Sequence, residues 1–296
     1  HAGEIILAAG RVFKIHRVVS SGQSFFEGCA SRRAIGEFAP IMALPATDSI
    51  RDMSSIIILF AVLATAFLSA VFGMAGGLIL MGVLAALLPV PAAMVMHGAV
   101  QSVSNGWRAV LLRRYILWKS IGWYLIGSAG VALALLSFTL ILPRPWLFIV
   151  LGLVPLIVWV PKSVFALDAT KPGQGIACGV SVTGLNVIAG VSGPLLDTFF
   201  QNVEADRRAI VATKATTQVA AHGVKIAYYV APALAAGEGG SFWLIAVAIP
   251  LSVIGTTLGA KVLERMSEDV FRRWTKRLVT GIGAYYFVQG LWLLVS

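Results

Sequence analysis

Long apolar runs are the feature that most constrains this chain. From Ser54 onward, several stretches approach the 20 or so apolar residues that a helix needs to cross the ~30 Å hydrocarbon core of a bilayer. The full-length candidates are 92–112, 120–140, 145–160, 209–231, 241–260 and 278–295, of which 145–160 is short. Only 12% of the residues are charged, against about 25% in soluble domains. The chain is therefore predicted to be an all-α, polytopic membrane helix bundle, which excludes a cytosolic enzyme, a disordered chain and a disulfide scaffold.

Two further apolar regions, 54–89 and 174–203, are broken by glycines. Each is either one kinked crossing or a hairpin of two helices that returns to its starting side. Basic residues discriminate between these arrangements, because cytoplasmic loops carry an excess of Lys and Arg. With two hairpins, 13 of the 17 Lys and Arg residues after Met53 lie on one side, one lies on the other and three lie within spans; with two single crossings the distribution is 5 against 9. The sequence therefore predicts two hairpins.

The two glycine breaks belong to an internal repeat with a shift of 117 residues. Gly73 aligns with Gly190, Gly76 with Gly193, and Gln101 with Gln218. The charge distribution gives the two copies opposite orientations, so we predict two inverted repeats, each a glycine-broken hairpin plus three full transmembrane helices, as in many secondary transporters. The predicted segments are an extension at 1–52, a first membrane repeat at 53–161, a cytoplasmic linker at 162–173 and a second membrane repeat at 174–296. The extension is expected to be poorly ordered or to lie upstream of a true start at Met53.

Each repeat places four polar residues on one helix face, at positions i, i+4, i+8 and i+11. They are His97, Gln101, Asn105 and Arg108 in the first copy and Lys214, Gln218, His222 and Lys225 in the second. Ionisable side chains within a span cost roughly 2.5–3.5 kcal/mol each and normally face a cavity or a partner. Two interpretations stay open: the long basic side chains reach the interface and the glutamines bond between helices, or the stripes line a substrate path.

The glycine breaks permit unwound backbone inside the protein, which is tolerated where it is buried or lines a cavity. Helices starting at Gly77 and Pro194 would point free N–H groups and a partial positive charge at such a cavity; close helix packing is the alternative role for the glycines. Together with the stripes, two converging helix starts predict a site for a small anion. The predicted substrate-binding residues are Gly73, Gly76, Gly77, Gln101, Asn105, Gly190, Ser192, Gly193, Lys214, Gln218 and His222.

One acidic residue, Asp197, lies within an apolar region, and its repeat partner is Leu80. Asp197 either carries a coupling proton or caps a helix or pairs with a basic residue; His97 and His222 are further candidate proton carriers. The two cysteines, Cys29 and Cys178, have no metal-binding or CxxC spacing, so neither a metal nor another cofactor is expected. Because the basic residues form short clusters between apolar runs, they indicate cytoplasmic loops and not a nucleic-acid footprint.

The chain resembles the sulfite exporter TauE/SafE family of bacterial membrane proteins over roughly 54–295. The resemblance rests on the G-x-x-G-G break from Gly73 to Gly77 and its copy at Gly190 to Gly193, and on the helices that carry Gln101, Asn105 and Gly106 and then Lys214 and Gln218. It implies export of sulfite, sulfoacetate or a related small sulfur anion across the bacterial inner membrane. An anion channel and a carrier for a non-sulfur organic anion are the alternatives. An intramembrane enzyme is not expected, since the sequence contains neither HExxH nor a nucleophile–base constellation at recognisable spacing.

Overall fold

The computed structural model describes residues 46–135, 137, 140–161, 167–237, 243–263 and 265–296. Within these ranges the regular structure is helical and no strand is found. Most of the predicted extension, residues 1–45, lies outside the described residues. Helix α1 begins at Ala46, so the predicted boundary at Met53 falls inside this helix.

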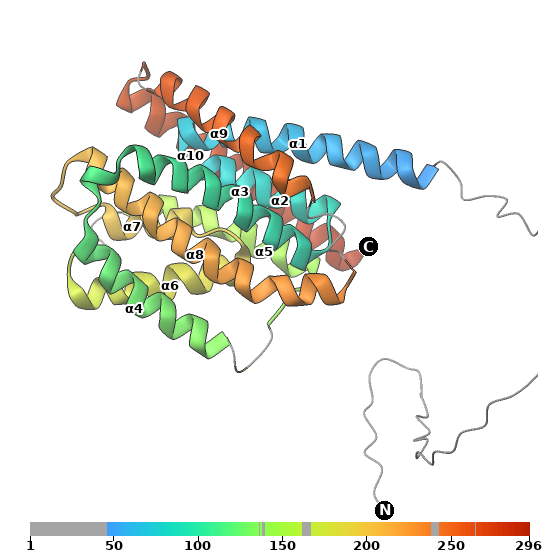
Figure 1. Cartoon of the computed structure of the whole chain (residues 1–296), viewed down its shortest axis with the longest axis horizontal. Helices are drawn as coiled ribbons and strands as arrows, with labels where there is room; N and C mark the ends of the chain where they lie inside the picture. Colours follow the sequence, from blue (N-terminus) through green and yellow to red (C-terminus); the bar gives the residue numbers. More distant parts are fainter. Residues whose placement is uncertain (1–45, 136, 138–139, 162–166, 238–242, 264) are drawn as a thin grey trace, which may run out of the picture. The chain divides into compact units, whose positions relative to one another are not determined.

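The helices follow one another with short connections (Figure 1). The first half holds α1 (Ala46–Phe72), α2 (Met74–Leu87), α3 (Val90–Leu111), the 3-10 helix η1 (Arg113–Tyr115), α4 (Trp118–Leu135), α5 (Arg144–Leu153) and the 3-10 helix η2 (Val154–Trp159). The second half holds α6 (Pro172–Ala189), α7 (Gly193–Phe200), α8 (Arg207–Ala235), α9 (Trp243–Leu263) and α10 (Glu268–Val295). The all-α prediction is confirmed.

Three segments among the described residues are long and apolar enough to cross a membrane: Met53–Phe72, Trp243–Leu263 and Arg273–Val295. The last belongs to α10, which starts at Glu268, ten residues before the predicted span at 278–295. The short predicted span 145–160 is divided between α5 and η2. Pro155 lies at this change of helix type, and because proline lacks an N–H it removes one α-helical hydrogen bond.

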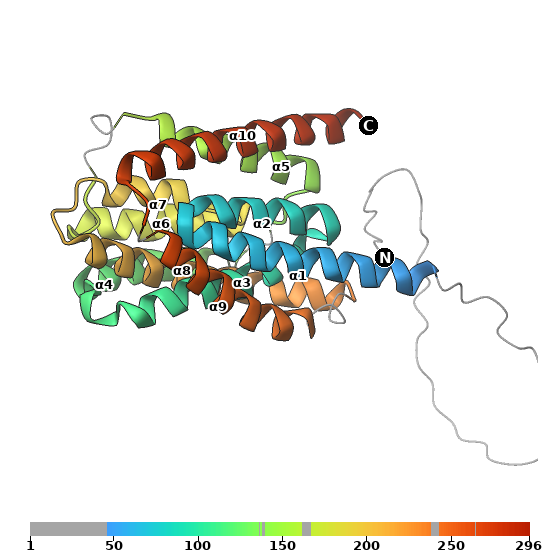
Figure 2. The ribbon, with the colours of Figure 1, turned by 90° about the horizontal axis from the view of Figure 1, so that it is seen from above.

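The first glycine break is a tight reversal between α1 and α2. Gly73 takes a left-handed φ of +64°, a conformation that only glycine adopts readily. After the reversal α2 lies against α1 so closely that a β-carbon on Gly76 would overlap the carbonyl oxygen of Thr65 and the nitrogen of Ser69. Figure 2 shows the two helices side by side. The first region is therefore a hairpin, as predicted.

The second glycine break is also a hairpin. Gly190 ends α6 with a left-handed φ of +77°, a common helix terminator, and the chain turns into α7. The backbone N–H of Ala169, just before α6, donates to the carbonyl of Phe199 near the end of α7 at 2.9 Å. The end of the hairpin thus returns to where the hairpin begins, as predicted.

Helices α3 and α8 form an antiparallel pair in the centre of the bundle. Gly98 of α3 faces Ile226 of α8, where a β-carbon on the glycine would lie 2.7 Å from Cγ1, and Gly106 faces Val219. Around this pair α1 packs on α9, α4 packs on α6, and α5 lies along α10 (Figure 2). The polar stripes predicted on the two central helices therefore lie on the helices that face each other.

Basic residues gather at the end of the bundle where α3 ends and α8 begins. Arg208 donates to the hydroxyl of Tyr115 at 3.1 Å, and Lys261 lines a small groove together with Arg108. Arg144 lies at the opposite end of α3, where it donates to the carbonyl of Leu88 at 3.0 Å. This separation matches the two sides assigned from the charge distribution.

Candidate functional site

A cavity of about 660 Å³ lies between the starts of α2 and α7 and the facing surfaces of α3 and α8. Its volume falls within the ~300–1,000 Å³ typical of small-molecule sites. Of the predicted substrate-binding and proton-carrying residues, those that line it are Gly73, Gly77, His97, Gln101, Asn105, Ser192, Gly193, Asp197, Lys214, Gln218 and His222. Both polar stripes therefore contribute to one cavity.

Both helix starts reach this cavity, although neither begins where the sequence analysis placed it. Helix α2 starts at Met74 rather than Gly77, because a single residue, Gly73, makes the reversal. Helix α7 starts at Gly193, with Pro194 in its second position, where its missing N–H costs no helical bond. The first turn of each helix has backbone N–H groups without intrahelical acceptors, so the cavity wall carries partial positive charge from two sides.

Four side chains in the cavity wall carry buried polar atoms without a hydrogen-bond partner in the described structure. They are the amide nitrogens of Gln101 and Gln218 and the hydroxyls of Ser192 and Thr275. Gln101 is 5% exposed and Ser192 is 1% exposed. Buried polar groups are paired in most proteins, so an orphan group needs an explanation. Four such groups around one cavity are accounted for if the cavity holds a polar solute.

Two of the predicted glycines do not line the cavity. Gly76 allows α2 to pack closely against α1. For this glycine, the alternative role of close helix packing is therefore the one that the structure shows. Gly190 has a similarly confined position, since a β-carbon there would lie 2.6 Å from Sδ of Met81. Its carbonyl, however, accepts a hydrogen bond from Lys225 at 2.9 Å.

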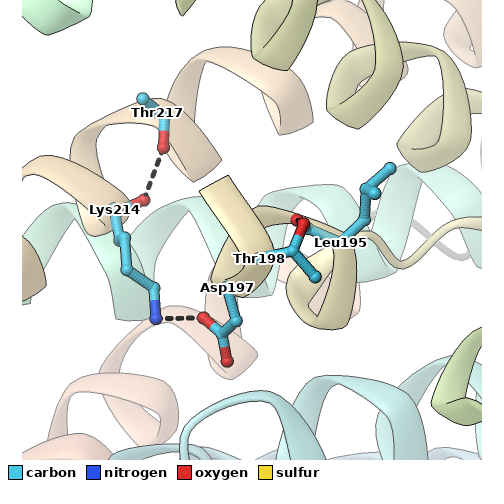
Figure 3. A network of polar contacts seen from close by, with 5 residues as sticks. All are labelled: Leu195, Asp197, Thr198, Lys214 and Thr217. Carbon is cyan, nitrogen blue, oxygen red and sulfur yellow. Dashed lines mark hydrogen bonds and ion pairs between the residues drawn. The ribbon is translucent and has the colours of Figure 1, made fainter. Parts of the chain in front are cut away.

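Asp197 is ion-paired with Lys214 (Figure 3). Both side chains line the cavity. Each side chain is 29% exposed. The expectation that Asp197 pairs with a basic residue is confirmed. The pair comes from α7 and α8 and places its negative charge next to the cavity, where it offsets the positive charge of Lys214.

His97 and His222 meet at the deep end of the cavity, with ring centroids 5.5 Å apart in an edge-to-face arrangement. His97 Nε2 lies 2.9 Å from the carbonyl of Gly77, which can only accept, so Nε2 carries the ring hydrogen. His222 Nδ1 lies 3.2 Å from the side-chain nitrogen of Asn186 and accepts from it, which leaves the hydrogen on Nε2. Both histidines are therefore held in defined tautomers by their neighbours.

Basic side chains lead from the deep end to the surface. Arg108 donates to the carbonyl of Ser69 at 3.3 Å and lines the cavity, while Arg207 and Arg208 lie at the exposed end of its wall. The hydrogen bond to the Tyr115 hydroxyl and the nearby Asp206 charge raise the pKa of Arg208, which remains a cation. Four basic side chains thus line the cavity against one acidic residue, a balance that favours an anion.

Sequence reasoning missed part of this wall. Arg207 and Arg208 were counted as loop charges, but they line the cavity at its entrance. The one sequence signal for this role is their position directly before the polar stripe of α8. Lys225 was weighed as a residue that reaches the interface, which is wrong: its side chain is 0% exposed. Among the described residues, no cluster of three or more His, Cys, Asp or Glu side chains suited to a metal ion is found.

Comparison with known proteins gives one match. The family described as Sulfite exporter TauE/SafE matches residues 57–286, well over half of the chain. No curated protein and no solved structure matches the chain. The matched range includes both hairpins, both polar stripes and the whole cavity wall.

Proposed function

Because the chain belongs to the sulfite exporter TauE/SafE family, a family of membrane transporters, we propose that it is a secondary carrier that exports a small anion. Sulfite, sulfoacetate and related sulfur oxyanions are the proposed substrates, and the bacterial inner membrane is the proposed location, with several crossings. The family match supports a transmembrane transporter for sulfur anions. The cavity supports the choice of an anion.

The observation that carries this proposal is the set of orphan donors around a cationic cavity. The amide groups of Gln101 and Gln218 and the hydroxyl of Ser192 lack partners there, and two helix starts supply backbone N–H groups. An oxyanion has several acceptor oxygens and needs hydrogen-bond donors from the protein, so it would satisfy these groups together. Gly73, Gly77 and Gly193 let the backbone approach it, and Asn105, Lys214 and His222 complete the proposed site.

Alternating access of two inverted repeats is the proposed mechanism. Shifting the chain by 117 residues carries α1 onto α6, α3 onto α8 and α4 onto the first part of α9. In chain order, α5 then corresponds to α10, although the constant shift takes it only to the first residues of that helix. Under this exchange the α1–α9 packing becomes the α6–α4 packing, while the α3–α8 and α5–α10 pairs map onto themselves. Helices α3 and α8 are antiparallel, which is what a two-fold axis in the membrane plane requires of a self-mapping pair.

The cavity reaches the surface at the end of the bundle that carries the basic clusters. The positive-inside rule assigns this end to the cytoplasm, so this conformation would load its anion from inside the cell. Asp197 and His97 remain candidate proton carriers, since both line the cavity.

Proteoliposomes provide the test. Vesicles containing the purified protein and loaded with sulfite, thiosulfate, sulfoacetate or a simple carboxylate should release one of these anions faster than empty vesicles, with a rate that saturates. A pH gradient of either sign shows whether a proton moves with the anion. No flux of any anion would refute the proposal, and flux without saturation would indicate a channel.

A further inference from the structure

Lys225 is a basic residue that is fully buried in the described structure. It lies on α8, three residues past His222, and its side chain is 0% exposed. Its Nζ atom is 2.9 Å from the carbonyl oxygen of Gly190 and 2.8 Å from Nδ1 of His97. Gly190 caps the C-terminal end of α6, where the partial negative charge of the helix favours a cation.

These contacts join the two glycine breaks. His97 donates from Nε2 to the carbonyl of Gly77, so its Nδ1 atom is left as the acceptor for Lys225. The resulting chain of hydrogen bonds runs from Gly77 through His97 and Lys225 to Gly190. Its first two members belong to the first half of the chain and its last two to the second. We call these four residues the tip bridge.

The tip bridge lies where the cavity ends. His97 and Gly77 line the cavity, but Lys225 and Gly190 do not. On the far side the space is filled by Met81, Met94, Val187, Tyr229 and Ala233, each at most 1% exposed. The cavity is therefore closed in this direction by apolar packing that directly adjoins the bridge.

Opening the cavity in this direction requires the two halves to separate. Such a movement takes Lys225 away from His97 and breaks the hydrogen bond that joins the two tips. Buried polar groups without partners are costly, and buried charges more so. The bridge therefore favours the closed arrangement over any in which the tips are apart.

We propose that Lys225 is the gating residue that holds the far end of the cavity closed by tying the two glycine breaks together. It acts through His97 and the two backbone carbonyls rather than by contact with the anion, so it is a positioning residue. This inference rests on the proposed transport function only for its role in alternating access. The closure itself is a property of the structure.

The other end of the cavity shows the matching positions in a different arrangement. The 117-residue shift relates His97 to Lys214 and Lys225 to Arg108. Where His97 and Lys225 bind each other, Lys214 binds Asp197 and Arg108 binds the carbonyl of Ser69. The equivalent link is thus made at the closed end and replaced by other partners at the open end, as expected of two gates used in turn.

Cysteine accessibility tests the gate without any transport measurement. Ala233, which is 0% exposed, is replaced by cysteine in a full-length protein with Cys29→Ser and Cys178→Ala, reconstituted in vesicles. A membrane-impermeant maleimide is applied on both sides. We expect Lys225→Met to raise the labelling rate of this cysteine at least tenfold over the parent. His97→Ala, which leaves Lys225 bound only to Gly190, should also raise it.

The matched control is Tyr229→Phe. The Tyr229 hydroxyl donates to the carbonyl of Val187 at 3.0 Å, so this variant also loses a buried hydrogen bond of α8, but one made within the second half. Its labelling rate should stay within twofold of the parent. Equal labelling rates in the parent, Lys225→Met and His97→Ala would overturn the inference. If Lys225→Met does not fold, the comparison of His97→Ala with the parent decides.

Anion exchange in the same vesicles separates this inference from the proposed function. Faster labelling of Lys225→Met in a protein that moves no anion would leave the gate standing and refute the transport proposal. Saturable anion exchange by the parent, together with equal labelling of the parent and Lys225→Met, would support the transport proposal and refute the gate.

Discussion

Replacing Gln101 or Gln218 with leucine should separate anion binding from stability. The amide nitrogen of each glutamine is buried without a partner, so leucine removes a polar group that contributes no hydrogen bond to the fold. We therefore expect the free energy of unfolding to stay within about 0.5 kcal/mol of the wild-type value or to rise, because exchanging an unpaired buried polar group for an apolar one of similar size removes a desolvation cost.

The same substitutions should weaken binding of the anion. A hydrogen bond to a charged partner is worth about 1.5–3 kcal/mol, which corresponds to a roughly 10- to 150-fold increase in Kd. Gln101 lies against the start of α2, where a β-carbon on Gly77 would be 3.5 Å from its amide, so its loss removes a donor from the centre of the proposed site. At anion concentrations near the wild-type KM, transport should therefore fall to roughly 1–20% of the wild-type rate.

Gln174→Leu is the matched control. The Gln174 side chain accepts from the backbone N–H of Asp168 outside the cavity, so leucine should lower stability by about 1 kcal/mol and leave anion affinity unchanged. Titration calorimetry of the purified protein gives the Kd, and thermal unfolding in detergent gives the stability. Unchanged affinity in both Gln101→Leu and Gln218→Leu would refute the assignment of these amides as anion ligands.

Two further substitutions test neighbouring parts of the account. Asp197→Asn removes the negative charge beside the cavity and frees Lys214. Because the ion pair is partly exposed, the free energy of unfolding should change by at most about 1 kcal/mol, whereas anion affinity should rise by about tenfold, or ~1.4 kcal/mol. A fall in affinity would contradict the electrostatic argument. Gly76→Ala forces an overlap with the Thr65 carbonyl and should cost about 1–3 kcal/mol, while Gly77→Ala meets only ordinary contacts and should cost about 0.5 kcal/mol or less. Comparison of the two unfolding midpoints checks this, and equal midpoints would show that the α1–α2 contact is not tight.

The hairpins and the cavity wall could be predicted because their signals are local or periodic. Glycine at Gly73 and Gly190 marks a reversal that other residues resist, and charge counting then decides the direction of the chain. The spacing of Gln101 from His97, and of Gln218 from Lys214, places each pair on one helix face whatever the rest of the fold does. These features need no knowledge of which helices pack together.

What could not be predicted depends on contacts between distant segments. Lys225 looks like a residue near a helix end, and only the approach of α3 and of the α6 terminus shows that it is enclosed. The packing role of Gly76 depends on α1 lying within contact distance. Pairing of Asp197 with Lys214 was one of several alternatives, and the hairpin geometry that brings α7 beside α8 selects it.

The most direct test of the central claim is a structure of the protein determined with the transported anion present. The account predicts density for the anion between the start of α2 and the start of α7, within hydrogen-bonding distance of the Gln101 and Gln218 amides and the Ser192 hydroxyl. Density only beside Arg207 and Arg208 at the entrance, with the Gln101 and Gln218 amides and the Ser192 hydroxyl still unpaired, would contradict it.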